Sequence, residues 1–227
     1  MPPSHLSDDI VHEATQRFII TFMGHAFKHL VTITKHRHQV IRNASHMGIF
    51  FFSLHHDLSK YGPKEFWRSA KYYKGTYSPV YAERLENDYF SLICQHHTRR
   101  NPHHWEYWTD FFKGRVIAKT IPYKWALEYV CDVLSASKTY DPKNFSGQRA
   151  YEYFMGRKDH YYMTEASKEF ISWCLKMYAE SGFKCLKKKN TLARYNDITS
   201  RLPAVEVFDS LALLGEMPAL KEGKEGK

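Results

Sequence analysis

The sequence predicts an all-α fold, organised as a helical bundle. Long stretches of the chain carry apolar residues at helical spacing, strand signals are sparse, and no internal repeat is visible. Of its 227 residues, 43% are hydrophobic and 25% are charged, which is the composition of a globular protein with ample material for a core. Disordered, collagen-like and disulfide-scaffold classes are therefore excluded. The length fits one large domain, or one domain with an extension.

The first and longest predicted helix covers residues 8–45, a stretch without proline. An aspartate can cap its start, Gly24 marks a point at which it could break, and Gly48 ends the region. A second, shorter helix is expected over residues 50–60, and Gly62 should stop it.

Proline and glycine punctuate the helices that follow. Pro63 suits the first turn of a helix that runs to about residue 74, and residues 75–79 form a turn. A fourth helix is expected over residues 79–99, where Asn101 and the proline after it stop the chain from continuing.

Three more helices are predicted in the second half of the chain. The first begins at a proline and covers residues 122–140. A loop over residues 141–147 separates it from two further helices, at about 148–158 and 164–181.

The character of the chain changes beyond residue 183. Residues 184–189 form a basic run, and residues 222–227 form a charged, glycine-rich end. Residues 204–214 suit a short amphipathic helix, and the last ten residues are expected to be mobile. The sequence thus predicts a helical domain over residues 8–183 and a basic C-terminal extension over residues 184–227.

Cysteine usage and hydropathy indicate a cytoplasmic protein without a membrane partner. The chain lacks a C-x-x-C pair, which excludes a thiolate zinc finger and is typical of buried thiols in a reducing compartment. The four cysteines are Cys94, Cys131, Cys174 and Cys185. The N-terminus lacks the features of a secretory signal, and the most apolar run, residues 48–54, is far shorter than the roughly 20 residues that cross a bilayer. The oligomeric state is left open.

Histidine is distributed very unevenly. Of 14 histidines, 13 lie in the first 104 residues, and only His160 lies beyond them. The strongest local signal is the run from His55 to Lys60, which contains the pair His56-Asp57. A neutral nitrogen beside a hard anionic oxygen suits Mn, Fe, Co, Ni, Zn or Mg better than a thiolate site does. Such pairs are common by chance, so the companions of this pair decide its meaning.

The companions include two helical histidines and one aspartate. His29 and His36 are seven residues apart and share one face of the first predicted helix. His36 is the preferred metal ligand, and His29 is a candidate ligand or phosphate contact. A hydrogen-bonded core histidine is the alternative for each. Asp132 lies on an apolar, aromatic helix stripe, where it needs a cation or a salt bridge to offset its desolvation.

A second histidine-rich segment follows the fourth predicted helix. It contains His96-His97 and, seven residues later, His103-His104. Between the two pairs, adjacent arginines suit a phosphate-bearing substrate, because guanidinium groups bind phosphate through two parallel hydrogen bonds. The predicted substrate contacts are Arg99, Arg100, His103 and His104. A solvated cationic loop is the alternative for this segment, and core packing is the alternative for the tryptophans 105 and 108 that follow it.

The order of these residues resembles that of the HD-domain metal-dependent phosphohydrolases, an all-α superfamily. A helical histidine, a His-Asp pair and a distant aspartate are matched by His36, His56-Asp57 and Asp132. In the HD-GYP branch, His-Asp-Ile-Gly-Lys resembles residues 56–60, and a His-His pair resembles His96-His97. The segment after that branch's last metal-binding aspartate resembles the residues that follow Asp132.

The chain is also similar to uncharacterised bacterial and viral proteins that share two segments, His-Asp-Leu-Ser-Lys and Arg-Asn-Pro-His-His-x-Glu-Tyr-Trp. The resemblance covers roughly residues 25–175 and implies an HD-like helical domain that holds a divalent metal. The implied ligands are His36, His56, Asp57 and Asp132, with His29, His96 and His97 as further candidates. The Gly-Tyr-Pro triplet is absent, and no histidine lies between residues 60 and 95, which argues against cyclic-dinucleotide cleavage and a full two- or three-metal cluster.

The expected function is divalent-metal-dependent hydrolysis of a phosphate ester, such as a nucleotide or a related small molecule. Asp57 would position the attacking water, while Lys60 would neutralise charge on the phosphate, unless it is a solvated charge at a helix end. Two alternatives stay open. The net charge of +9 and the lysines at 187–189 permit a non-catalytic nucleic-acid-binding or scaffold protein. Related helical frames also host iron-dependent oxygenases.

Overall fold

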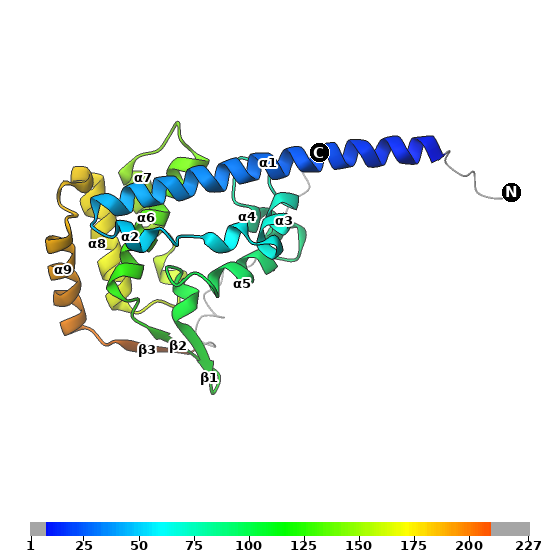
Figure 1. Cartoon of the computed structure of the whole chain (residues 1–227). Helices are drawn as coiled ribbons and strands as arrows, with labels where there is room; N and C mark the ends of the chain where they lie inside the picture. The colour runs from blue at the N-terminus through cyan, green and yellow to red at the C-terminus, as the bar shows by residue number, and fades with distance from the viewer. Residues whose placement is uncertain (1–7, 210–227) are drawn as a thin grey trace.

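A helical body carries a small antiparallel sheet at one end in the computed structural model, which describes residues 8–209 (Figure 1). The expectation of a mostly helical chain is confirmed. The sheet was not expected. The longest helix runs along one side of the body and continues past it, while the other helices pack beneath (Figure 1).

Helix α1 (Asp8–His46) is continuous through Gly24, so the break considered there does not occur. One glycine in a helix costs only about 1 kcal/mol relative to alanine, which the rest of a 39-residue helix outweighs. The C-terminal half packs on α6 (Tyr123–Tyr140), where Asn43 donates a buried hydrogen bond of 3.0 Å to Ser135 Oγ. The N-terminal part projects from the body (Figure 1).

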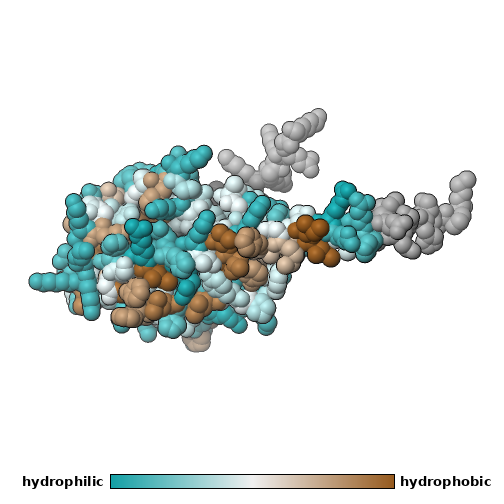
Figure 2. Space-filling view, turned by 45° about the horizontal axis from the view of Figure 1, so that its top comes forward, coloured by the Kyte–Doolittle hydropathy of each residue, from teal (hydrophilic) through white to brown (hydrophobic). Residues whose placement is uncertain are grey.

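Apolar side chains remain on the surface of that projecting part, as Figure 2 shows. The most exposed are Ile20, at 71%, and Phe27, at 67%. They contrast with Val40 and Ala44 in the second half of the same helix, which are fully buried in the core.

The helix expected over residues 50–60 is interrupted. Only α2 (Phe50–Ser53) and the 3-10 turn η1 (Leu58–Tyr61) form, because Asp57 adopts a left-handed φ of 53° between them. The Arg37 guanidinium of α1 holds this turn by donating to the backbone oxygens of Leu54 and His56. The turn is thereby fixed against α1.

Helix α3 (Pro63–Lys71) begins at the predicted proline. The single helix expected over residues 79–99 is wrong: the structure has α4 (Pro79–Glu86) and α5 (Leu92–Thr98) instead. Asp88 and Tyr89 have φ of 48° and 65°, which no helix accommodates. The Asn-Asp turn signal at residues 87–88 outweighs the apolar periodicity.

The sheet consists of β1 (Thr109–Phe112), β2 (Arg115–Lys119) and β3 (Val205–Asp209), in that order. Lys113 and Gly114 join the first two strands, both with positive φ. A two-residue turn of this kind matches the twist of an antiparallel hairpin. The turn η2 (Trp105–Trp108) leads into β1.

The three predicted helices of the second half are confirmed, with ends shifted by a few residues. They are α6, α7 (Gly147–Met155) and α8 (Glu165–Ser181). A 3-10 turn, η3 (Lys158–His160), joins the last two. Their apolar faces form the main core together with α1.

Residues 184–209 contribute to the same core and sheet. After the turn η4 (Gly182–Lys184), α9 (Lys188–Arg201) packs on α8, and Leu186 and Ile198 are fully buried. The helix expected over residues 204–214 is wrong as far as Asp209, because alternation of valine with charged residues places this segment in β3, paired with β2. The remainder of that segment and the predicted mobile tail lie outside the described residues.

Within residues 8–209, no helix is both long enough and apolar enough to cross a membrane. Cys131 and Cys174 are buried, whereas Cys94 and Cys185 are half-buried, and all four are free thiols. A cytoplasmic location stays a prediction.

Candidate metal centre

Asp57 lies at the middle of a group of histidines drawn from separate parts of the chain. Its carboxylate is 2% exposed. The Nε2 atom of His56 lies 3.2 Å from Asp57 Oδ2, and Nε2 of His97, from α5, lies 3.2 Å from Asp57 Oδ1. The Nε2 atom of His103 lies 3.5 Å from the same Oδ1. The left-handed turn at residue 57 thus directs this carboxylate inward.

Helices α1 and α6 contribute the other half of the group. The Nε2 atom of His36 lies 2.9 Å from Asp132 Oδ1 and 3.9 Å from Asp57 Oδ2. The Nε2 atoms of His36 and His56 are 3.5 Å apart. The four ligands implied by the resemblance therefore lie together.

Two sets of donor atoms meet at Asp57. One set is His36, His56 and Asp132, and the other is Asp57, His97, His103 and His104, with the donor atoms of each set within 4.8 Å of one another. Asp57 Oδ2 faces the first set, and Asp57 Oδ1 faces the second. A carboxylate in this position can serve two neighbouring cations.

Two buried glutamates orient the histidine rings. Glu128 Oε1 lies 2.8 Å from His56 Nδ1 and 3.5 Å from His103 Nδ1. Glu65 Oε1 lies 2.8 Å from His97 Nδ1. A carboxylate at Nδ1 holds the proton there and leaves Nε2 free as a metal ligand. All three rings therefore present Nε2 to Asp57.

Neither glutamate was predicted from the sequence. Glu128 had a signal, since it lies four residues before Asp132 on α6 and therefore on the same helix face. Glu65 had none, because its partner His97 comes from a different helix, α5, that only tertiary packing brings close.

Several buried atoms of the centre have no hydrogen-bond partner among the described residues. They include both carboxylate oxygens of Asp57 and the Nε2 atoms of His103 and His104. Asp57 instead has ion-pair neighbours, among them His56 and Lys60. Since buried polar groups are rarely left unsatisfied, these atoms fit a divalent cation, and their mixture of nitrogen and oxygen donors suits a first-row transition metal.

Electrostatics agree with this interpretation. Burial holds the pKa of His103 well below 6.5 and lowers the pKa of His104 to about 3, so both rings are neutral. Burial opposes protonation of His56, but the Asp57, Glu128 and Asp132 carboxylates outweigh it and raise its pKa to about 10. A cation at the centre would displace that proton.

Lys60 lies against Asp57 as well. Its Nζ is 2.6 Å from Asp57 Oδ2. Burial disfavours its charge, but the Asp57 and Asp132 carboxylates outweigh burial and raise the pKa of Lys60, so the ammonium stays charged. The predicted catalytic pair, Asp57 and Lys60, is therefore brought together.

The three further ligand candidates, His29, His96 and His97, lie at different distances from the centre. Only His97 reaches Asp57. His96 instead places Nδ1 3.1 Å from Glu65 Oε2, at the edge of the centre. His29 is buried against the rings of Phe66 and Tyr73 and belongs to neither donor set.

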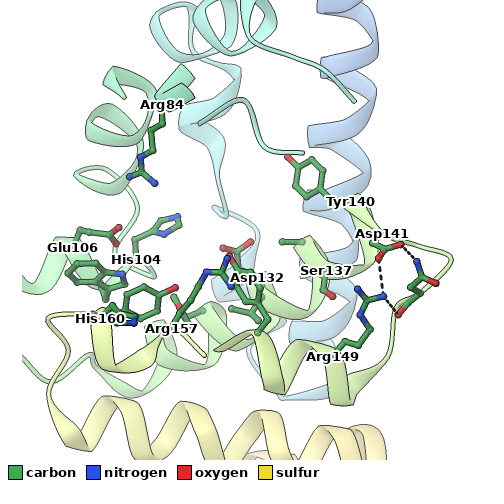
Figure 3. A pocket seen from close by; sticks show the side chains of 17 residues that line it. Arg84, His104, Glu106, Asp132, Ser137, Tyr140, Asp141, Arg149, Arg157 and His160 are labelled. Carbon is green, nitrogen blue, oxygen red and sulfur yellow. Dashed lines mark hydrogen bonds and ion pairs between the residues drawn. The ribbon is translucent and has the colours of Figure 1, made fainter. Parts of the chain in front are cut away.

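A pocket of about 780 Å³ lies beside the centre and is lined by Asp132 and His104 (Figure 3). Its volume is that of a small-molecule site. The guanidinium groups in its lining belong to Arg84, Arg149 and Arg157.

The structure places the predicted substrate residues differently. Arg99 and Arg100 are exposed and do not line this pocket. His103 is 1% exposed and faces Asp57, so it lies with the ligands, whereas His104 does line the pocket. The pocket arginines Arg84, Arg149 and Arg157 carried no sequence signal.

The two tryptophans also separate. Trp105 lines the pocket, stacked on Tyr161 with 5.4 Å between ring centroids. Trp108 packs against the core and donates its indole N–H to the backbone oxygen of Pro102 at 2.6 Å.

The chain belongs to a family of unknown function (DUF5662), which matches residues 25–177. That segment contains every residue of both donor sets and both orienting glutamates. No curated protein and no solved structure matches the chain.

Proposed function

We propose that the protein is a divalent-metal-dependent phosphohydrolase with an HD-domain-like centre. One observation carries the proposal: Asp57 is buried where three carboxylate-oriented histidines present Nε2 and two helices contribute His36 and Asp132. The residue order resembles that of the HD superfamily, and the mostly helical fold is compatible with it.

The ion would be held by His36, His56, Asp57 and Asp132, and a second ion by Asp57, His97, His103 and His104. A divalent ion there would polarise a phosphoryl oxygen and make a bound water more acidic. Mn, Fe, Co, Ni, Zn and Mg are the candidates, with the histidine-rich second set favouring a transition metal over Mg.

The chain's own groups supply binding and charge. Arg84 extends from α4 into the pocket and forms no ion pair within residues 8–209 (Figure 3). Its guanidinium donates one hydrogen bond, of 3.2 Å, to Cys94 Sγ, and its other donors are available to a phosphate. Lys60 adds a positive charge next to Asp57. The substrate is a phosphate ester of small-molecule size, such as a nucleotide, since Trp105 and Tyr161 offer a stacked aromatic wall.

The test begins with elemental analysis of the purified protein and of Asp57→Ala. Phosphate release is then screened on nucleotides and small phosphate esters with added Mn, Co, Ni and Mg. We expect bound divalent metal and metal-dependent release in the wild type, both lost in Asp57→Ala. A wild type without bound metal, or release that Asp57→Ala leaves unchanged, would sink the idea.

An iron-dependent oxygenase is the second candidate, favoured by one specific observation. His36, His56 and Asp132 form a set of two histidines and one carboxylate, the donors of non-haem iron oxygenases. Oxygen uptake by the iron-loaded protein, accompanied by a colour change, would support it. Phosphate release from an anaerobic sample would favour the hydrolase.

Non-catalytic nucleic-acid binding is less well supported by the site. The lysines at 187–189 are exposed at the start of α9, and none of them lines the pocket. Affinity for RNA or DNA that falls steeply with added salt would support this alternative.

A further inference from the structure

The pocket carries more positive charge than a single phosphate at the metal centre would use. Asp132 and His104 form the side that faces the centre. Arg84 comes from α4, whereas Arg149 and Arg157 come from α7 and the residue that precedes η3 (Figure 3). Cations therefore stand on two separate walls.

Arg157 is the free cation of the second wall. Its guanidinium lies 4.0 Å from the centroid of the Tyr153 ring, which holds the planar group in place, and it forms no ion pair with any residue between 8 and 209. Arg149, in contrast, is engaged by Asp141 at 3.1 Å and by the backbone oxygen of Asn144 at 3.3 Å (Figure 3). Arg157 therefore has unused hydrogen-bond donors directed at the pocket.

Aromatic side chains line the pocket as well. Trp105, Tyr129 and Tyr161 line the pocket, which at about 780 Å³ is far larger than a phosphate group needs. A flat, apolar body would fit between the two charged ends.

We infer that the substrate carries two anionic groups: a phosphate ester at the metal centre and a second phosphate or a carboxylate bound by Arg157. The inference rests on the proposed function for the role of the first phosphate. It adds a specificity site at Arg157, between α7 and η3, that the centre itself does not define.

Three probes of the same shape test it: phenyl phosphate, 4-carboxyphenyl phosphate and 1,4-phenylene bisphosphate. Binding to the full-length, Mn-loaded protein is measured by calorimetry. We expect at least one of the two probes with a second anionic group to bind about ten-fold or more tightly than phenyl phosphate. The reason is that the second anionic group gains a charge-assisted, bidentate contact. Which of the two gains more distinguishes a phosphate from a carboxylate.

Arg157→Met should abolish the advantage, so that all three probes bind with similar affinity. Arg115→Met is the matched control, because Arg115 is an exposed arginine on β2, paired with Asp209 at 3.1 Å outside the pocket. Equal affinity for all three probes, or an advantage that survives Arg157→Met, overturns the inference.

Phosphate release from the same probes is scored separately. Preferential binding without release upholds the second anion site and rejects the hydrolase. Release without preference upholds the hydrolase and rejects the second site.

Discussion

The metal centre and the pocket beside it are built from different kinds of segment. The ligands of the centre are mostly buried and stand on packed helices and one constrained turn, with His36 on α1 and Asp132 on α6. The arginines of the pocket are exposed and come from α4 and the α7–η3 region.

Under the proposed function, this difference would assign the chemistry to the centre and the substrate selectivity to the pocket. Glu128 and Glu65 hold the centre's rings from behind, so a change to any one group disturbs several others. An exposed side chain in the wall of the pocket can be substituted without disturbing the core. We therefore expect substitutions in the centre to affect metal binding and all substrates, and substitutions in the pocket to affect one substrate class at a time.

Asp57→Asn should give the largest effect. It keeps the shape of the side chain and removes the charge that both donor sets share. Metal affinity and activity should fall by more than about 100-fold, because the loss of even an outer carboxylate costs 10- to 100-fold. Elemental analysis and phosphate release measure the two losses. Asp110→Asn on the exposed strand β1 is the control, and retention of metal by Asp57→Asn would contradict the central role of Asp57.

Substitutions of the orienting glutamates should give the next largest effects, and they can distinguish the two proposed ion sites. Glu65→Gln should weaken one ion by about 10- to 100-fold, because Glu65 contacts only His97 of the ligands. Glu128→Gln should weaken both, since it faces His56 of one set and His103 of the other. Metal titration followed by calorimetry counts the ions that are lost. Identical profiles for the two variants would argue against two sites.

The centre could be predicted from the sequence to a much greater extent than the pocket. The residue types and their order along the chain are enough to identify the first group of candidate ligands without knowledge of the fold. These are His36, His56-Asp57 and Asp132. The arginines of the pocket are scattered, and only the packing of α4, α7 and η3 places them on one cavity. Arg99 and Arg100 were predicted as substrate contacts because they lie beside histidines in sequence, but the end of α5 exposes them.

The same distinction holds for the fold. Long helices such as α1 and α6 follow from periodicity alone. The strand β3 does not, because its five residues are a strand only where β2 offers a partner, and Ile198 joins the core only through the packing of α9 on α8.

Arg84→Ala and Arg99→Ala form a pair that tests the boundary of the pocket. The first should raise KM for a phosphate ester by about ten-fold with little change in metal content, because one charge-assisted contact is lost. The second should change neither, since Arg99 is exposed and outside the pocket. Steady-state kinetics on both variants decide between them, and the reverse order of effects would place the substrate on the α5 side.

Substitution of His29 should give the smallest effect, and it tests whether the metal centre extends along α1 beyond His36. It shares a face of α1 with His36, but both of its ring nitrogens are buried without a hydrogen-bond partner among the described residues. Burial, with the charge of Lys60, lowers its pKa from 6.5 to about 4. The unfolded chain therefore binds more protons than the folded chain between those values, so stability is lost as the pH falls through this window.

Between pH 8 and pH 6 that loss amounts to about 1 kcal/mol from His29 alone. His29→Phe keeps a flat ring against Phe66 and Tyr73, so it should reduce the pH dependence of the free energy of unfolding by this amount. Urea unfolding with a chelator present measures it without a contribution from metal release. The metal content of His29→Phe should equal that of the wild type; a lower content would extend the centre along α1 to His29.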